Sequence, residues 1–216
     1  MDEIDLEALA PIGVDHPVAA PPPDTQRPAD ATLVDGRLLE VGDLPSGVEL
    51  VAVAEAKGGE DALGAVLGEA PDAFAALNTA FSPDPLLLRI APGTVVSRPL
   101  VVRMHAATPG ALSAPRLVVD VGADAEVTVV EVQTSAPEAG LVASVTEIAV
   151  GASARARHLA VQDLDPATWQ VATQVSRVGQ SADFLAAGAA LGGGYARLRS
   201  DCRLVGRGAS GTPLAA

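Results

Sequence analysis

The 216-residue chain is acidic and poor in aromatic side chains, with a formal net charge of −13 and 2% Phe, Trp and Tyr. Residues 1–75 carry 16 acidic and three basic residues, whereas residues 76–216 carry 11 of each. Nucleic-acid binding requires clustered Lys and Arg, so this distribution argues against it. No apolar run is long enough to span a membrane, and the acidic N-terminus is unlike a secretion signal, so we expect a cytoplasmic protein.

Residues 1–30 are rich in acidic residues and proline and show no hydrophobic period, so we expect a flexible tail there. Residues 31–85 predict a small α/β region. Its first part contains short apolar pairs between turn formers, which indicates two or three strands with a hairpin at Asp35-Gly36.

Two helices are expected next. Asp61–Leu67 carries apolar residues at helical spacing. Pro71 suits the first turn of a second helix, whose apolar residues Phe74 and Leu77 lead to its end near Phe81.

Residues 86–216 repeat one pattern about five times, in which an alternating apolar run leads to a glycine and small residues and then to another run. The anchoring glycines are separated by 29, 29, 28 and 29 residues and are Gly93, Gly122, Gly151, Gly179 and Gly208. A fixed period of this size is typical of a solenoid. Because the alternation has period two, the pattern predicts a β-helix with a period of about 29 residues. The pattern does not determine whether each period forms one coil of the β-helix or a longer path of the chain.

Two strands illustrate the expected faces. In the repeat after Gly151, Ala154, Ala156, His158 and Ala160 alternate with a row that begins at Arg155, and an unpaired arginine row cannot be buried, so the alanine row should point inward. The strand that begins at Trp169 is expected to have one buried side, with Trp169, Val171, Thr173 and Val175 on one face and Gln170, Ala172 and Gln174 on the other.

The last residues, from Gly211 to Ala216, look like the start of another strand. A solenoid needs a terminal cap that covers its open end, and no capping sequence is visible here. We therefore expect a β-helix core over residues 86–216 that is truncated at its C-terminus.

Few residues are candidates for a catalytic or binding site. Gly206–Gly211 matches the glycine pattern of dinucleotide-binding loops, but no helix can follow it and the repeat already explains Gly208. Cys202 is the single cysteine and can form no internal disulfide. We interpret it as a small buried side chain. His158 reads as an inward-facing histidine with a hydrogen-bond partner, and His16 and His105 belong to no constellation. We predict no catalytic, cofactor-binding or metal-binding residue; His158 and Cys202 are the only functional candidates.

Several stretches together resemble a known family. In sequence order they are Phe74–Phe81 with Leu77 and Asn78, Ile90–Gly93, Val145–Gly151 with His158, Leu191–Gly194 with Arg197, and Arg203–Ala209. They span about residues 71–214 and resemble the SufB/SufD family of iron–sulfur cluster assembly proteins, most of all SufD.

The resemblance implies a right-handed parallel β-helix with a scaffold role. It implies two partners, a SufB-like subunit and a SufC-like ATPase, with the iron–sulfur cluster handled by the complex and no cofactor bound by this chain alone. Sulfur-receiving cysteines are mainly a SufB property, which suits a chain with Cys202 alone. The Trp-Arg stretch usual before the helices is missing, as is the C-terminal part that in the family holds the SufB-facing histidine and the SufC-binding helices.

The sequence therefore predicts a non-enzymatic scaffold subunit of a SufBCD-type complex that binds neither nucleic acid nor membrane. Two alternatives stay open. A secreted β-helix enzyme acting on polysaccharide would require a secretion signal and several carboxylates on one strand face. A purely structural solenoid would require more nearly identical repeats.

Overall fold

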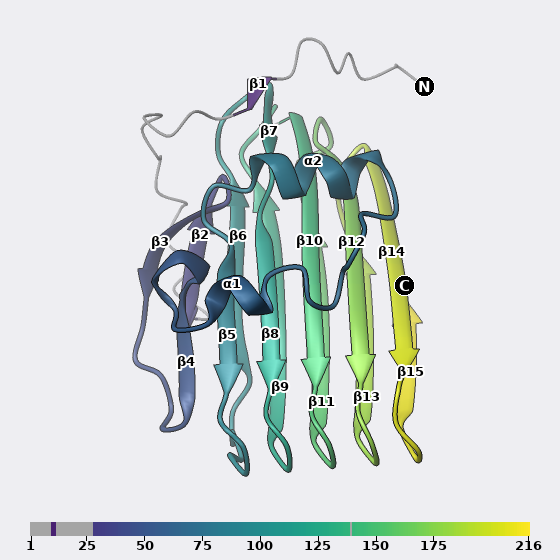
Figure 1. Cartoon of the computed structure of the whole chain (residues 1–216). Coiled ribbons are helices and arrows are strands. Elements are labelled where there is room, and N and C mark those ends of the chain that lie inside the picture. Colours follow the sequence, from purple (N-terminus) through teal and green to yellow (C-terminus); the bar gives the residue numbers. More distant parts are fainter. Residues whose placement is uncertain (1–9, 12–27, 139) are drawn as a thin grey trace.

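The computed structural model describes residues 10–11, 28–138 and 140–216 (Figure 1). Most of the predicted flexible tail, with His16, lies outside the described residues. The chain is mainly β, with 53% strand and 9% helix, and forms a β-solenoid of about five turns after a small N-terminal α/β region. None of the helices in the described residues is long and apolar enough to cross a membrane.

Each period of the sequence repeat forms one coil made of two strands. The first strand of every coil joins one parallel sheet, sheet A, and the second joins an opposing sheet, sheet B. Leu141 in one coil lies beside Trp169 in the next, 28 residues on, and Glu126 lies beside Arg155, 29 residues on. The strand pairs are β5 Leu86–Ile90 and β6 Leu100–Ala106, β8 Arg116–Val121 and β9 Glu126–Ser135, β10 Gly140–Val150 and β11 Arg155–Asp163, β12 Trp169–Val178 and β13 Asp183–Ala190, and β14 Tyr195–Leu204 and β15 Ser210–Ala215.

The turn from sheet A to sheet B explains the repeated glycine. The Gly151 N–H donates to Val121 O in the preceding coil at 2.8 Å, and a Cβ at this position would lie 2.7 Å from Ala123 N. A side chain would therefore collide with the backbone of the coil below. Two residues later Ser153 has a left-handed backbone, with φ of 57°.

Two of the five anchoring glycines do not occupy this stacked position. Gly93 and Gly208 have φ of 70° and 71° and fill the left-handed position that Ser153 fills in its own coil. Gly206 is the stacked glycine of its turn, because a Cβ there would lie 2.2 Å from Gln180 N. The repeat is confirmed, but Gly93 and Gly208 lie two residues after the stacked position of their turns.

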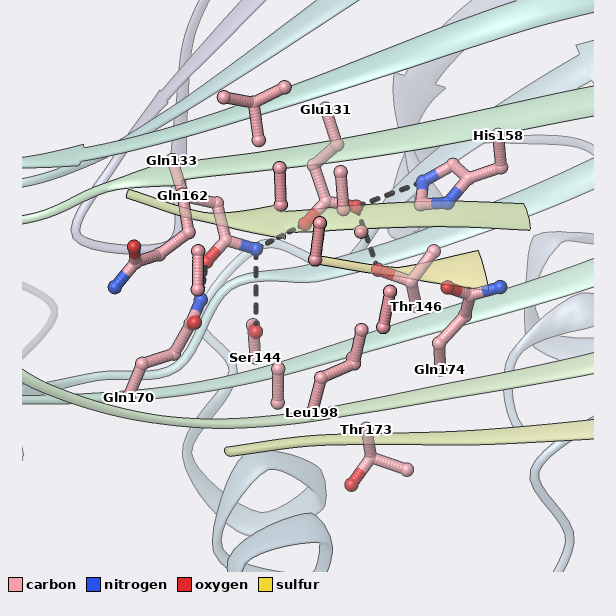
Figure 2. A pocket seen from close by; sticks show the side chains of 18 residues that line it. Glu131, Gln133, Ser144, Thr146, His158, Gln162, Gln170, Thr173, Gln174 and Leu198 are labelled. Carbon is pink, nitrogen blue, oxygen red and sulfur yellow. Dashed lines mark hydrogen bonds and ion pairs between the residues drawn. The ribbon is translucent and has the colours of Figure 1, made fainter. Parts of the chain in front are cut away.

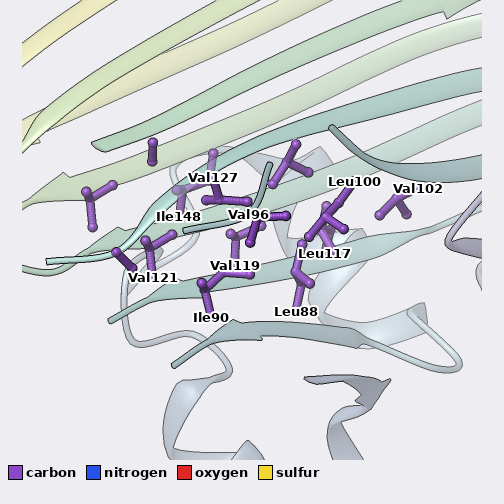
Figure 3. Packing of buried hydrophobic residues seen from close by; sticks show 14 of the residues in the cluster. Leu88, Ile90, Val96, Leu100, Val102, Leu117, Val119, Val121, Val127 and Ile148 are labelled. Carbon is purple, nitrogen blue, oxygen red and sulfur yellow. The ribbon is translucent and has the colours of Figure 1, made fainter. Parts of the chain in front are cut away.

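Near these turns the interior between the sheets is apolar (Figure 3). Leu88, Ile90 and Val119 from sheet A meet Val127 and Val129 from sheet B, and all are at most 2% exposed. Burying such side chains contributes about 1.5–3 kcal/mol each. The predicted inward row at and after Ala154 is confirmed, since Ala154, Ala156 and His158 are buried and Ala160 lines the interior.

The N-terminal region extends both sheets. Asp35-Gly36 forms the predicted hairpin between β2 Ala31–Val34 and β3 Arg37–Val41. β2 then continues sheet B parallel to β6, whereas β4 Val48–Ala52 continues sheet A antiparallel to β5. The short strands β1 Ala10–Pro11 and β7 Ala111–Ser113 pair at another part of sheet A, and a 3-10 turn, η1, covers Val53–Glu55.

The two helix predictions had different outcomes. The second helix is confirmed as α2 Ala73–Phe81, although Asp72 caps it and Pro71 lies just before the cap. The first is wrong, since α1 covers only Gly59–Ala62 and the following residues form turns. In those turns, backbone N–H groups donate to the buried carboxylate of Glu147. These hydrogen bonds compete with the ones that a helix would form.

The helical region covers the outer face of sheet A (Figure 1). Phe74 on α2 packs against the buried cluster that contains Val171, and Val175 shares a second cluster with Val66 and Leu67. The prediction that β12 has one buried side is therefore wrong, since both of its faces are covered. Its Gln170 and Gln174 face the interior of the solenoid rather than solvent.

Candidate functional site

Away from the glycine turns, the solenoid interior becomes polar and contains a cavity of about 240 Å³ that is partly open to solvent (Figure 2). The space exists because several inward positions carry almost no side chain. These small residues are Ala160, Ala172, Gly188, Ala190 and Ala215. Larger polar side chains on β9, β10, β11 and β12 project into the space that the small residues leave.

Glu131 on β9 is at the centre of a hydrogen-bond network in this cavity. The carboxylate is 2% exposed and accepts a hydrogen bond from Thr146 Oγ1 at 2.9 Å. Gln133 Nε2 donates to its other oxygen, and Gln170 Nε2 donates to Gln133 Oε1. His158 Nε2 lies 3.2 Å from Glu131 Oε2. Side chains from three strands, β9, β10 and β11, therefore converge on one carboxylate, and Gln170 on β12 joins the network through Gln133.

Burial by itself would raise the pKa of the Glu131 carboxyl, because low-dielectric surroundings disfavour charge. Hydrogen bonds from His158, Gln133 and Thr146, together with the charge of His158, outweigh this effect and leave the pKa below its ordinary value of 4.5. Glu131 is therefore a carboxylate at neutral pH. Its stabilising contribution is present above the ordinary pKa and is lost as the pH falls through the lowered one.

His158 is inward as predicted, and its expected partner is Glu131. Only one ring nitrogen is used, because His158 Nδ1 is buried and has no hydrogen-bond partner among the described residues. Gln174 Nε2, which also lines the cavity, is in the same situation. Gln174 lies beside Thr146 in the parallel register of β10 and β12, so both face the same part of the cavity as His158 (Figure 2).

The other candidates lie elsewhere. Cys202 is partly buried and packs against the apolar interior, as predicted for a small hydrophobic side chain, and does not line the cavity. His105 Nδ1 lies 2.9 Å from Thr134 Oγ1, apart from Glu131 and His158. Gly206–Gly211 leads into strand β15 and not into a helix, which agrees with its repeat interpretation.

Sequence reasoning missed Glu131 and the glutamines. The signal was present, since Val127, Val129, Glu131 and Gln133 share one parity on β9 and the first two are core residues. Polar residues at the later inward positions of that strand therefore had to be buried. The described residues contain no group of three or more His, Cys, Asp and Glu placed to hold a metal ion.

Comparison with known proteins places this cavity within a recognised domain. Residues 103–215 match the family model described as "SUF system FeS cluster assembly, SufBD core domain". The chain belongs to the SufBD family. No curated protein matches the chain. The SufBD core domain includes most of β6 and runs to the end of β15, so it contains both Glu131 and His158.

Membership of the SufBD family links the chain to iron–sulfur cluster assembly and confirms the family resemblance at that level. The resemblance to SufD rather than SufB stays a prediction.

Proposed function

We propose that this chain is a scaffold subunit of a cytoplasmic SufBCD-type iron–sulfur cluster assembly complex, on the SufD side of a pair with a SufB-like β-helix. A SufC-like ATPase is its second partner. The observation that carries the proposal is the SufBD core domain match over residues 103–215, which coincides with the coils of the solenoid. The cluster is the cargo of the whole complex, and this chain acts without catalysis of its own.

In this proposal, pairing with the SufB-like β-helix adds a strand at a solenoid edge such as the one that β14 and β15 form in the described residues. Each of these strands has a neighbour on one side only within the described residues. Leu204 on β14 and Leu214 on β15 are 53% and 55% exposed. Unpaired backbone groups beside exposed leucines suit the addition of a further strand, since main-chain hydrogen bonds give affinity and side-chain contacts give specificity. ATP-driven movement of a SufC-like partner would then rearrange this junction.

The cavity argues against a polysaccharide-cleaving enzyme. Glycoside hydrolysis ordinarily uses two carboxyl groups that flank the scissile bond. Among the described residues that line the cavity, Glu131 is the single carboxylate, and hydrogen bonds already surround it.

The test is co-purification. The tagged chain is produced together with a SufB-like subunit and a SufC-like ATPase and run on size exclusion with light scattering. We expect one joint peak that contains all three chains. Leu204→Asp should weaken the peak, whereas Leu39→Asp, a matched change of an exposed leucine on the distant strand β3, should leave it intact. Elution of the unmodified chain alone would refute the proposal.

A further inference from the structure

The two outer faces of the solenoid differ in what covers them. The helical region lies over sheet A, where α2 packs on β10 and β12 (Figure 1). On sheet B, every outward-facing residue of β9 and β11 is half-buried or exposed in the described residues. The outer face of sheet B is therefore accessible to a partner in the part of the chain that the structure describes.

Two adjacent rows of outward side chains on this face are apolar. In register across β9, β11 and β13, the first row is Val130, Leu159 and Ala187, and the second is Val132, Val161 and Ala189. We call these residues the sheet B patch. Leu159 near its centre is 37% exposed. Contiguous apolar surface of this kind marks interaction sites on soluble proteins.

The outward residues are arranged symmetrically along the strands, with two apolar residues between two polar ones. They are Thr128, Val130, Val132 and Thr134 on β9, and Arg157, Leu159, Val161 and Asp163 on β11. A two-fold axis that lies between the two apolar rows and crosses the strands at right angles therefore places apolar residues of one copy opposite apolar residues of another. A two-fold homodimer requires such a surface, since the same patch serves both copies.

Opposite charges near the two ends of β11 match the same axis. Arg157 and Asp163 are exposed, and neither has an ion-pair partner among the described residues. The axis places Arg157 of each copy opposite Asp163 of the other, so the contact forms twice. An axis parallel to the strands would instead place Arg157 over Arg157, and such like-charge contacts are unfavourable. The charges therefore favour one orientation of two copies.

The size of the face suits a reversible dimer. The five strands of sheet B from β6 to β15, about 4.8 Å apart, and the nine residues of β11, about 3.3 Å each, give a face of about 700 Å². Standard interfaces bury about 800 Å² on each partner. We propose that two copies of the chain associate face to face through sheet B, with the sheets about 10 Å apart and Arg157 paired with Asp163 across the axis.

The part of the chain that carries this face has no net charge. Residues 76–216 contain 11 acidic and 11 basic residues, so the acidic first third does not place its charge in the contact. The contact uses outward side chains of sheet B, whereas the strand pairing proposed above uses backbone groups at the edge of β14 and β15. The inference therefore goes beyond the scaffold role and does not depend on it.

The experiment is sedimentation velocity on the purified chain alone, from low to high micromolar concentration. We expect a reversible equilibrium between monomer and dimer. Leu159→Asp should weaken the dimer about tenfold or more, because it places a charge in an apolar contact. Two control changes should leave the dimer intact. Phe81→Asp alters an exposed apolar residue on α2 over sheet A, and Leu204→Asp alters one on the edge strand β14.

The charged pair provides a second test that leaves the sheet B patch unchanged. Arg157→Asp and Asp163→Arg should each weaken the dimer several-fold, since each places like charges opposite one another. The double variant should restore it, because the pair is then reversed. Circular dichroism establishes that each variant is folded, and if Leu159→Asp does not fold, the charge variants decide.

Four results would each overturn the proposal. They are a chain that stays monomeric at high micromolar concentration, a dimer that survives Leu159→Asp, loss of the dimer in Leu204→Asp, and a double charge variant that associates no better than the single ones.

Discussion

Glu147 on β10 and Arg116 on β8 form an ion pair beneath the N-terminal region, with 2.6 Å between Arg116 Nη2 and Glu147 Oε1. Glu147 is 0% exposed and also accepts hydrogen bonds from the backbone N–H groups of Gly64, Val66 and Leu67. One carboxylate thus joins two neighbouring coils to a segment about eighty residues earlier in the chain. This contact holds the turns over the outer face of sheet A.

Removal of the Glu147 carboxylate should destabilise the fold strongly. We expect Glu147→Ala to lower the free energy of unfolding by about 3–5 kcal/mol, because Arg116 is left as an unpaired buried charge. Urea denaturation measures the change. Glu126→Ala is the matched control, since Glu126 faces Arg155 across 3.9 Å on the exposed surface and should contribute about 0.5 kcal/mol or less. Equal losses for the two variants would contradict the structure.

Asn78 ties α2 to the solenoid. Its Nδ2 donates to Pro115 O and to Ala143 O, both at 2.8 Å, so one buried amide bridges two coils. We expect Asn78→Leu to destabilise the chain by about 2 kcal/mol or more, because two buried hydrogen bonds between α2 and the solenoid are lost. Thermal unfolding checks this, with Ala76→Leu at an exposed position of the same helix as the control. A stability of Asn78→Leu equal to that of the control would show that the bridge is unimportant.

Gly151 and Gly93 should respond differently to alanine. At Gly151 the new Cβ would lie 2.7–2.9 Å from backbone atoms of the coil below, so we expect a loss of about 3 kcal/mol. At Gly93 no atom lies within 4 Å of the new Cβ, and the cost is that of a left-handed alanine, about 1 kcal/mol. Chemical denaturation of both variants tests the distinction between stacked and left-handed positions, and the reverse order would refute it.

His105 should make the chain less stable in mild acid. Burial, with a smaller contribution from Arg103, outweighs the attraction of Asp35 and holds the pKa of its imidazole below the ordinary 6.5. The unfolded chain therefore binds a proton that the folded chain resists, and stability falls as the pH drops below about 6.5. The free energy of unfolding should decrease less between pH 7.5 and 5.5 in His105→Gln than in the unmodified chain. Identical pH profiles would contradict this assignment.

The sequence indicated the solenoid well because its repeat is a direct consequence of stacking. Position 151 requires glycine because the backbone of the coil below lies in contact with it. The residues around His158 alternate because the strand has one inward and one outward face. Both causes act within one period, so both are visible in the linear sequence.

Features that depend on distant segments were missed. The turns at Gly64–Leu67 look helical in sequence and differ because Glu147, some eighty residues later, takes their N–H groups. The sequence places Gln170 and Gln174 on one face of β12 but predicts only one buried side, because the cover that α2 gives to the opposite face comes from a distant segment. The candidate site was predicted only at His158, because its partner Glu131 lies on the preceding coil, 27 residues away.

Hydrogen–deuterium exchange in the presence of a SufB-like partner tests the proposed pairing most directly. The account predicts that backbone amides of β14 and β15, residues 195–215, gain protection when the partner is added, while those of β3 at the far edge of sheet B do not. Unchanged exchange in β14 and β15, or protection confined to another part of the chain, would contradict pairing through this edge of the solenoid.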